Sequence, residues 1–384
     1  MSVTVVSGQN MTSNVLSGRI VVPMDKTIAL LEPSETPLLT ILQRIKKVNI
    51  NHYRTVWLEK APLPWYIQTD AAIDASGAGT ITITDFAFLR ANDVLINDRT
   101  NEVLLITATP TTSTVAVVRG AGTTHAAVLA ADKWYRASSA EGEGTGSPDS
   151  RGVEETEHSN LVQIIKEPIE GSATLEKTDL HGGPQRPGEQ KWAGMEHKKK
   201  YERAVCFGEL RDSTDANSKP LRMMRGLFSD AGFVATKRYD MSAGYTEADF
   251  DMNITDAFEY GSDTKVGFAG KTAMLGINAF ARDKLRVIHP SKDKGKLNYG
   301  ITVAVWNNGY GTLQLIPAKQ WKGDNKARML GILDLKNVEL RHQFPTVLEK
   351  DIQAPDLHGY KDQWLTGGTV VCKNEETCAL FTGM

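Results

Sequence analysis

Residues 189–210 read EQKWAGMEHKKKYERAVCFGEL, and they form the longest predicted helix of the chain. The helix is entered through Pro187, which suits a first turn because no amide hydrogen bond is needed there. Its 22 residues would span roughly 33 Å at about 1.5 Å per residue. The apolar residues form only a partial stripe among many charges: Trp192, Met195, Tyr201, Val205 and Cys206. We therefore expect the helix to lie along a sheet with one face in solvent.

Extended segments precede this helix. Residues 53–57 (YRTVW) alternate polar with β-branched or aromatic side chains, and residues 161–178 are also typical of extended chain. Between residues 71 and 139, four short β-branched runs are separated by polar turns: 80–84, 93–96, 103–107 and 114–118. This pattern predicts a small antiparallel β unit of four or more strands, with a core so modest that it leans on the rest of the protein or on a neighbouring chain.

After the long helix, helical and extended patterns alternate. Helices are expected over residues 247–260 and 279–287, and a strand over 272–277. Further strands are expected over residues 301–306, 312–316, 328–333, 338–341 and 370–373. The whole pattern predicts a mixed α+β fold.

Length and charge exclude several broad classes of protein. The 384 residues suffice for two or three domains. Forty-four Lys and Arg against 46 Asp and Glu leave a net charge of -2, so the chain as a whole has no basic excess that would bind nucleic acid or anionic lipid. No run approaches the ~18 apolar residues of a membrane span, and the first residues do not resemble a signal peptide. We expect a soluble, unsecreted protein without a membrane partner.

Two segments are too polar for a core. Residues 1–18 carry no charged side chain and are rich in Ser, Thr, Asn and Gly, which indicates a flexible arm. A short helix is expected to follow, with Thr36 as a cap and Pro37 in its first turn. Residues 141–157 hold six acidic residues against the single basic Arg151, which indicates a mobile acidic loop.

The search for chemistry finds no catalytic centre. Lys265 stands where a phosphate-binding loop before Gly270-Lys-Thr would need its first glycine. His181-Gly-Gly resembles an esterase oxyanion loop, but the chain has no G-x-S-x-G motif. The three cysteines, Cys206, Cys372 and Cys378, match neither a zinc site nor a disulfide framework. We expect no cofactor, no metal and no enzymatic activity; an assembly or structural role fits such a chain.

One basic run could bind packaged nucleic acid. Between residues 282 and 296 it places six cations against two aspartates: Arg282, Lys284, Arg286, Lys292, Lys294 and Lys296. A solvated face is the alternative interpretation.

The order of segments resembles the major capsid proteins of tailed bacteriophages with the Hong Kong 97-type fold. The resemblance rests on LEPSETPLLT at 31–40, VWLEKAPLP at 56–64, VAVVRGAGTT at 115–124, SNLVQI at 159–164, the charged long helix, and the tail from His358 to Gly383. Together these motifs cover most of the chain.

This resemblance implies a domain order. Residues 1–36 would be the N-arm, and 37–178 the extended loop, with the inserted β unit at about 71–140 and the acidic segment at 141–157. Residues 179–220 would hold the spine helix of the peripheral domain, 221–345 the axial domain, and 346–384 the return to the peripheral domain.

The resemblance also implies partners and assembly contacts. The chain would form hexamers and pentamers of an icosahedral head in the bacterial cytoplasm, together with a scaffolding protein, a portal and a decoration protein, and would enclose double-stranded DNA through non-specific contacts. Expected assembly contacts are Glu32, Pro33, Thr36 and Pro37 in the arm, Trp57 and Glu59 at the loop base, Arg119 and Gly120 in the β unit, and Glu202 and Arg203 on the long helix. Local capping and packing within the chain remain the alternative role for each.

Two other functions stay open. A cellular nanocompartment shell would have the same fold but enclose a cargo enzyme, and an unfamiliar soluble enzyme could use the acidic loop or the His181 region.

Overall fold

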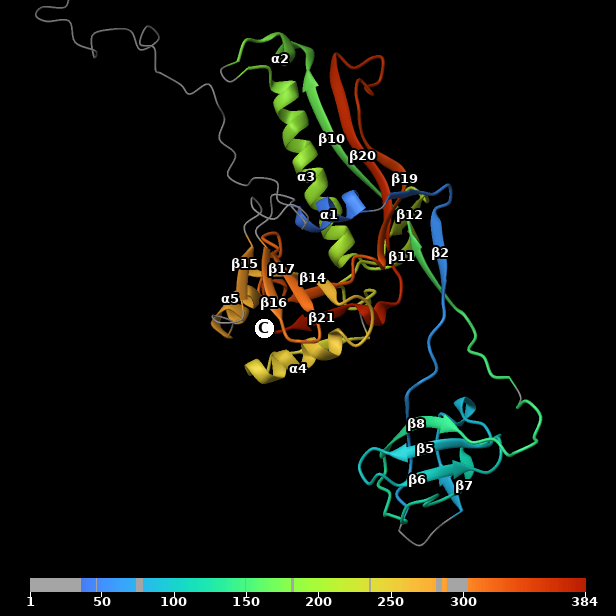
Figure 1. Ribbon diagram of the computed structural model, residues 1–384. Coiled ribbons are helices and arrows are strands. Elements are labelled where there is room, and N and C mark those ends of the chain that lie inside the picture. The colour runs from blue at the N-terminus through green and yellow to red at the C-terminus, as the bar shows by residue number, and fades with distance from the viewer. Residues whose placement is uncertain are drawn as a thin grey trace, which may run out of the picture. The chain divides into compact units, whose positions relative to one another are not determined.

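The computed structural model describes residues 36–45, 47–73, 79–148, 150–180, 183–234, 236–280, 285–288 and 303–384. The chain divides into two compact units: residues 58–157 form one, and the residues up to Trp57 and from His158 onward form the other. The expected α+β class is confirmed, and strands dominate it (Figure 1).

The larger unit contains a four-stranded sheet that carries the long helix. Its strands, in spatial order, are β1 (Lys47–Asn49), β19 (Val338–Glu349), β20 (Gly359–Cys372) and β10 (Gln163–Ser172). The pairing is antiparallel except between β1 and β19. Helix α3 (Gln185–Phe207) runs alongside β10 and β20 (Figure 1), and short α2 (Ala173–Lys177) precedes it. The predicted long helix and its sheet are thus confirmed, with the helix beginning four residues earlier than expected.

A seven-stranded mixed sheet forms the second layer of this unit. Its order is β13 (Arg238–Asp240), β21 (Ala379–Thr382), β18 (Leu330–Leu333), β14 (Thr264–Ala269), β17 (Thr312–Pro317), β16 (Val303–Asn307) and β15 (Leu285–Ile288). Side chains alternate between two cores, as in a sheet covered on both faces. Ala379 and Phe381 pack with α4 (Glu247–Ala257) and α5 (Lys271–Phe280), whereas Leu380 packs with α3 and with α1 (Pro37–Ile45).

Two predictions in this sheet were wrong. The expected strand at 272–277 is helix α5, because Ala273 and Ile277 lie one turn apart and are buried on the same face. The helix expected at 279–287 is not found there: α5 ends at Phe280, and residues 285–288 form strand β15, which pairs with β16. An apolar run this short does not by itself distinguish a helix from a strand.

The smaller unit is a six-stranded antiparallel barrel. Its order is β3 (Tyr66–Gln68), β8 (Lys133–Ser139), β5 (Asp93–Asn97), β6 (Val103–Ile106), β7 (Thr114–Val118) and β4 (Thr80–Thr82). The Asp70 amide, just beyond β3, donates to the carbonyl of Thr82 in β4 at 3.0 Å, which brings the two edge strands together. Trp134 and Leu95 lie in a core made entirely of residues from this unit. The unit therefore has more than the modest core we expected.

Two small ribbons complete the strands. β2 (Arg54–Glu59) pairs with β9 (Thr156–Leu161), and β11 (Arg211–Thr214) with β12 (Pro220–Met223). The structure also contains 3-10 turns, at Phe86–Phe88, Lys326–Arg328 and Glu375–Thr377. Within the described residues, no helix is both long and apolar enough to cross a membrane.

Candidate assembly surfaces

Helix α1 is fixed to α3 through a buried carboxylate. The backbone amide of Leu39 in the first turn of α1 donates to Oε2 of Glu202 at 3.2 Å. Amides of a first turn have no partner inside their own helix, so Glu202 supplies one from α3. Burial raises the pKa of Glu202 from 4.5 to about 8, although the Leu39 bond lowers it. Glu202 thus serves packing within the chain.

The predicted helix start at Pro37 is confirmed, whereas the capping role of Thr36 stays a prediction. α1 begins at Pro37, and Thr36 directly before it is buried. Glu32 and Pro33 lie outside the described residues. Arg203 is exposed and has no hydrogen-bond or ion-pair partner in the part of the chain that is described, so its guanidinium is available to another chain.

The far end of α3 is held by a charge network that the sequence did not reveal. Arg186 donates to Asp362 in β20 through Nε at 2.8 Å and Nη2 at 2.6 Å, and Gln190 donates to the same carboxylate at 2.6 Å. These bonds to the Arg186 guanidinium lower the pKa of Asp362 to about 2. The partners are 176 residues apart, and no local motif marks such a pair.

A buried lysine of strand β14 joins the sheet to the end of helix α4 and to the 3-10 turn before β21. The Nζ of Lys265 donates to the carbonyls of Ala257, Tyr260 and Thr377 at 2.6, 2.7 and 2.6 Å. Ala257 ends α4, so the ammonium also satisfies a free carbonyl of that helix. In the sequence, only the position of a lysine within a largely apolar strand could have indicated this buried contact. The role of Lys265 is structural.

The base of the extended loop combines a packed and an exposed face. Trp57 is buried and stacks on His158, with ring centroids 6.1 Å apart, and also packs against Phe233. Val56 and Leu58 point to the other face of β2 and are exposed. Glu59 lies half-buried at the end of the same strand. The structure places Trp57 in the chain's own core and leaves its neighbours available to a partner.

Arg119 and Gly120 lie within the barrel, where Arg119 forms a buried ion pair with Glu102. Arg119 meets Glu102 through Nε at 3.0 Å and Nη2 at 2.8 Å, and the two side chains are 1% and 0% exposed. Gly120 has φ of 61°, and a Cβ there would lie 2.5 Å from His125 Cδ2. The guanidinium is therefore engaged inside this unit, and glycine is required beside it.

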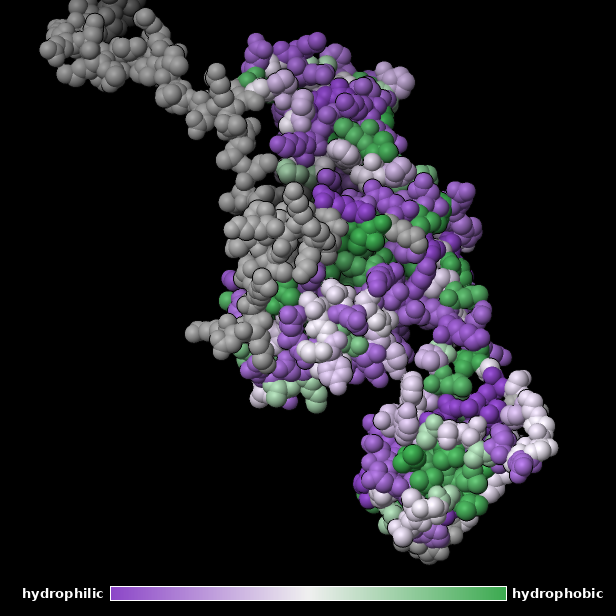
Figure 2. All heavy atoms as spheres, in the orientation of Figure 1, coloured by the Kyte–Doolittle hydropathy of each residue, from purple (hydrophilic) through white to green (hydrophobic). Residues whose placement is uncertain are grey.

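The outer face of the barrel is apolar. Val94, Leu105 and Val118 lie in register across β5, β6 and β7, and beside them Ile96 is paired with Val103. Val118 is 48% exposed. Figure 2 shows apolar side chains gathered over these three strands. We call these five residues the barrel face; strands that are apolar on both sides predict a covered surface.

The structure does not describe the side chains of the basic run. Arg282, Lys284, Lys292, Lys294 and Lys296 lie outside the described residues, and only the backbone of Arg286, in β15, is described. Among the described residues, no group of three His, Cys, Asp or Glu side chains could hold a metal ion.

The architecture defines the fold class. The long helix on one sheet, the mixed sheet between helical layers and the inserted unit have the Hong Kong 97-type arrangement found in solved capsid structures. The cyanophage A-1(L) capsid structure has a TM-score of 0.54 over 97% of this chain and 99% of its own, at 10% identity. The capsid of a native GTA particle has a TM-score of 0.52 over 97% of both chains, at 7% identity.

The chain belongs to the SU10 major capsid protein family, whose model matches residues 5–384. It is a major capsid protein, a structural component of the phage head. The holo-SrpI encapsulin complex from Synechococcus elongatus is similar at a TM-score of 0.44 and 10% identity, over 60% of this chain and 78% of its own. No curated protein matches the sequence.

Proposed function

We propose that copies of this chain assemble as pentamers and hexamers into a closed icosahedral shell that encloses double-stranded DNA. The barrel face carries this proposal, because Val118 is exposed and its four apolar neighbours are only half-buried in the isolated chain. Burying such a surface between copies is favourable by about 25 cal/mol per Å² of apolar area. A shell gives every copy the same partner surface.

The proposal includes the partners of assembly. A separate scaffolding protein would direct the curvature, and portal and decoration proteins would join the shell, which is made in the host cytoplasm. The arm, with Glu32, Pro33, Thr36 and Pro37, would lie on neighbouring copies, and Arg203 would pair across an interface.

Substitutions in the basic run test whether the shell encloses DNA. The six cations Arg282, Lys284, Arg286, Lys292, Lys294 and Lys296 are all changed to Gln, and particles are purified after infection or co-expression with the neighbouring phage genes. Because the cations would neutralise phosphates, nuclease-protected DNA per particle should fall while shell formation continues. Unchanged DNA content would contradict a lumenal role, and packaged protein in place of DNA would identify a nanocompartment.

A further inference from the structure

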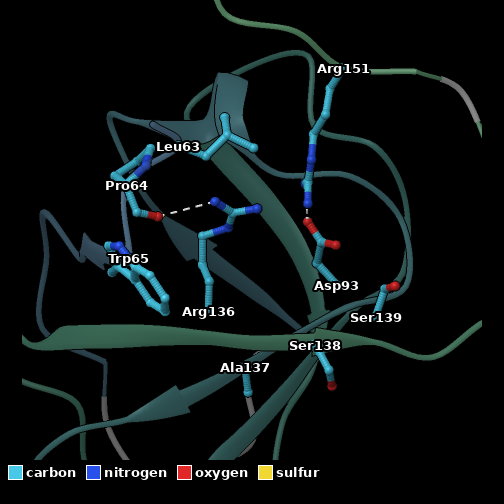
Figure 3. A pocket seen from close by; sticks show the side chains of 9 residues that line it. All are labelled: Leu63, Pro64, Trp65, Asp93, Arg136, Ala137, Ser138, Ser139 and Arg151. Atoms are coloured by element: carbon cyan, nitrogen blue, oxygen red, sulfur yellow. Dashed lines mark hydrogen bonds and ion pairs between the residues drawn. The ribbon is translucent and has the colours of Figure 1, made fainter. Parts of the chain in front are cut away.

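A pocket of about 380 Å³ opens on the barrel unit between residues 63–65 and strand β8. Polar and aromatic side chains dominate its lining: Trp65, Asp93, Arg136, Ser138, Ser139 and Arg151 (Figure 3). All of them belong to the residue 58–157 unit. We call it the Arg136 pocket.

An irregularity in β8 creates the pocket wall. Along the β5–β8 pairing, Val94 lies opposite Ser138 and Leu95 lies opposite Arg136, so Ala137 is an extra residue. A bulge of this kind redirects the neighbouring side chains. Arg136 thereby reaches the carbonyl of Pro64, to which its Nη1 donates at 3.1 Å.

The carboxylate in the pocket is already engaged. Asp93 accepts from Arg151 Nη1 at 2.6 Å and from the Arg90 amide at 3.1 Å, and the Arg90 side chain lies 3.7 Å away. In Figure 3 the Arg151 side chain reaches down to Asp93, whereas Arg136 stands apart from both. Asp93 thus forms its ion pairs with Arg151 and Arg90 rather than with Arg136.

Arg136 has no hydrogen-bonded counter-anion among the described residues. The Pro64 carbonyl is its side chain's one acceptor among the described residues, and its buried Nε makes no hydrogen bond there. Burial and the charge of Arg151 lower the pKa of Arg136, and the nearby Asp93 carboxylate offsets only part of that effect. A guanidinium fork with an unused Nε edge matches a carboxylate in two-point geometry.

We propose that the Arg136 pocket binds the carboxylate of an Asp or Glu side chain from a second copy of this chain. The serine hydroxyls offer further donors, and Trp65, which is 58% exposed, offers an aromatic wall of the kind found at the centre of protein interfaces. Suitable carboxylates exist, since Glu143, Glu154 and Glu155 are exposed and have no ion-pair partner within the described ranges. The inference rests on the proposed assembly of copies.

The test compares Arg136→Gln with Lys133→Gln in the full chain. Both changes remove one positive charge from β8, and Lys133 is exposed and outside the pocket. Particle dissociation is followed in urea, which is uncharged and does not screen ion pairs. Arg136→Gln particles should dissociate at lower denaturant than wild type, and Lys133→Gln particles should match wild type. Equal midpoints for all three proteins would overturn the contact with a second copy.

A second measurement examines the pocket without assembly. Dissociated subunits are melted in acetate and in chloride at equal ionic strength. Acetate should raise the melting temperature of wild type and of Lys133→Gln by a few degrees through binding, but not that of Arg136→Gln. No acetate effect in wild type would overturn the anion site itself. An acetate effect with unaffected particles would assign the pocket to a free anion, and failure of wild type to form particles would contradict the proposed function instead.

Discussion

At the residue scale, this capsid protein buries several ionisable side chains, and each is satisfied in a different way. Glu202 meets a helix amide, Lys265 meets three carbonyls, and Arg119 meets Glu102. Burying an ionisable group is costly unless its hydrogen bonds are replaced. These sites should therefore be sensitive to pH and to loss of one partner.

Glu202→Gln should change how stability depends on pH. The folded chain holds the Glu202 proton up to a pKa of about 8 and the unfolded chain only to about 4.5. Between these values the folded state binds more protons, so rising pH lowers wild-type stability. The variant should lack this contribution. The difference in free energy of unfolding between wild type and variant should therefore change by more than about 1 kcal/mol between about pH 5 and about pH 8.

Urea unfolding of dissociated subunits from about pH 5 to about pH 8 measures this difference. His197 and His342, whose pKa values are lowered by burial, contribute the opposite slope below about pH 6.5, but they are common to both proteins. Parallel pH profiles would show that Glu202 is not buried as described.

Glu102→Gln should destabilise the barrel unit. The change leaves the Arg119 guanidinium buried beside a neutral group, and breaking a buried pair costs about 3–5 kcal/mol. Glu141→Gln is the matched control, because Glu141 lies on the surface of the same unit, 32% exposed and 3.9 Å from Arg90, and its loss should cost under about 1 kcal/mol. Thermal melting of both variants checks the order; similar losses would contradict a buried Arg119.

At the element scale, periodicity predicted what is long or strongly patterned. Helix α3, the start of α1 at Pro37 and the antiparallel strands of the barrel follow from local sequence. Helix α5 and strand β15 did not, because their short apolar runs suit either structure. The ion pair of Arg186 with Asp362 and the engagement of Arg119 with Glu102 depend on tertiary pairing, which no spacing along the chain encodes.

The barrel face should act in assembly rather than in folding. Val118→Glu places a charge at an exposed apolar position of β7, so shells should form poorly. The free energy of unfolding of the subunit should stay within about 1 kcal/mol of the wild-type value. Thr114→Glu, at the exposed opposite end of β7, provides the control for added charge. Sedimentation separates shells from subunits. Normal shells from Val118→Glu would show that no copy covers this face.

At the scale of the whole molecule, the chain combines two compact units with separate cores. Many modest contacts among identical copies can close a shell and still allow errors to dissociate.

Deletion of residues 1–25 tests the role of the arm in that assembly. Residues 1–25 are too polar to form a core of their own, so we expect them to gain stability only on a neighbouring copy. We expect the truncated chain to give no particles or particles of the wrong size, while its subunits melt like wild type. Particles of normal size and yield would contradict the arm hypothesis.

Negative-stain electron microscopy of the full chain tests the central claim most directly, with expression both alone and together with the neighbouring phage genes. Closed shells of uniform size, with genes for a scaffolding protein improving their regularity, are the predicted result. A uniform small oligomer under both conditions would contradict self-assembly into a shell.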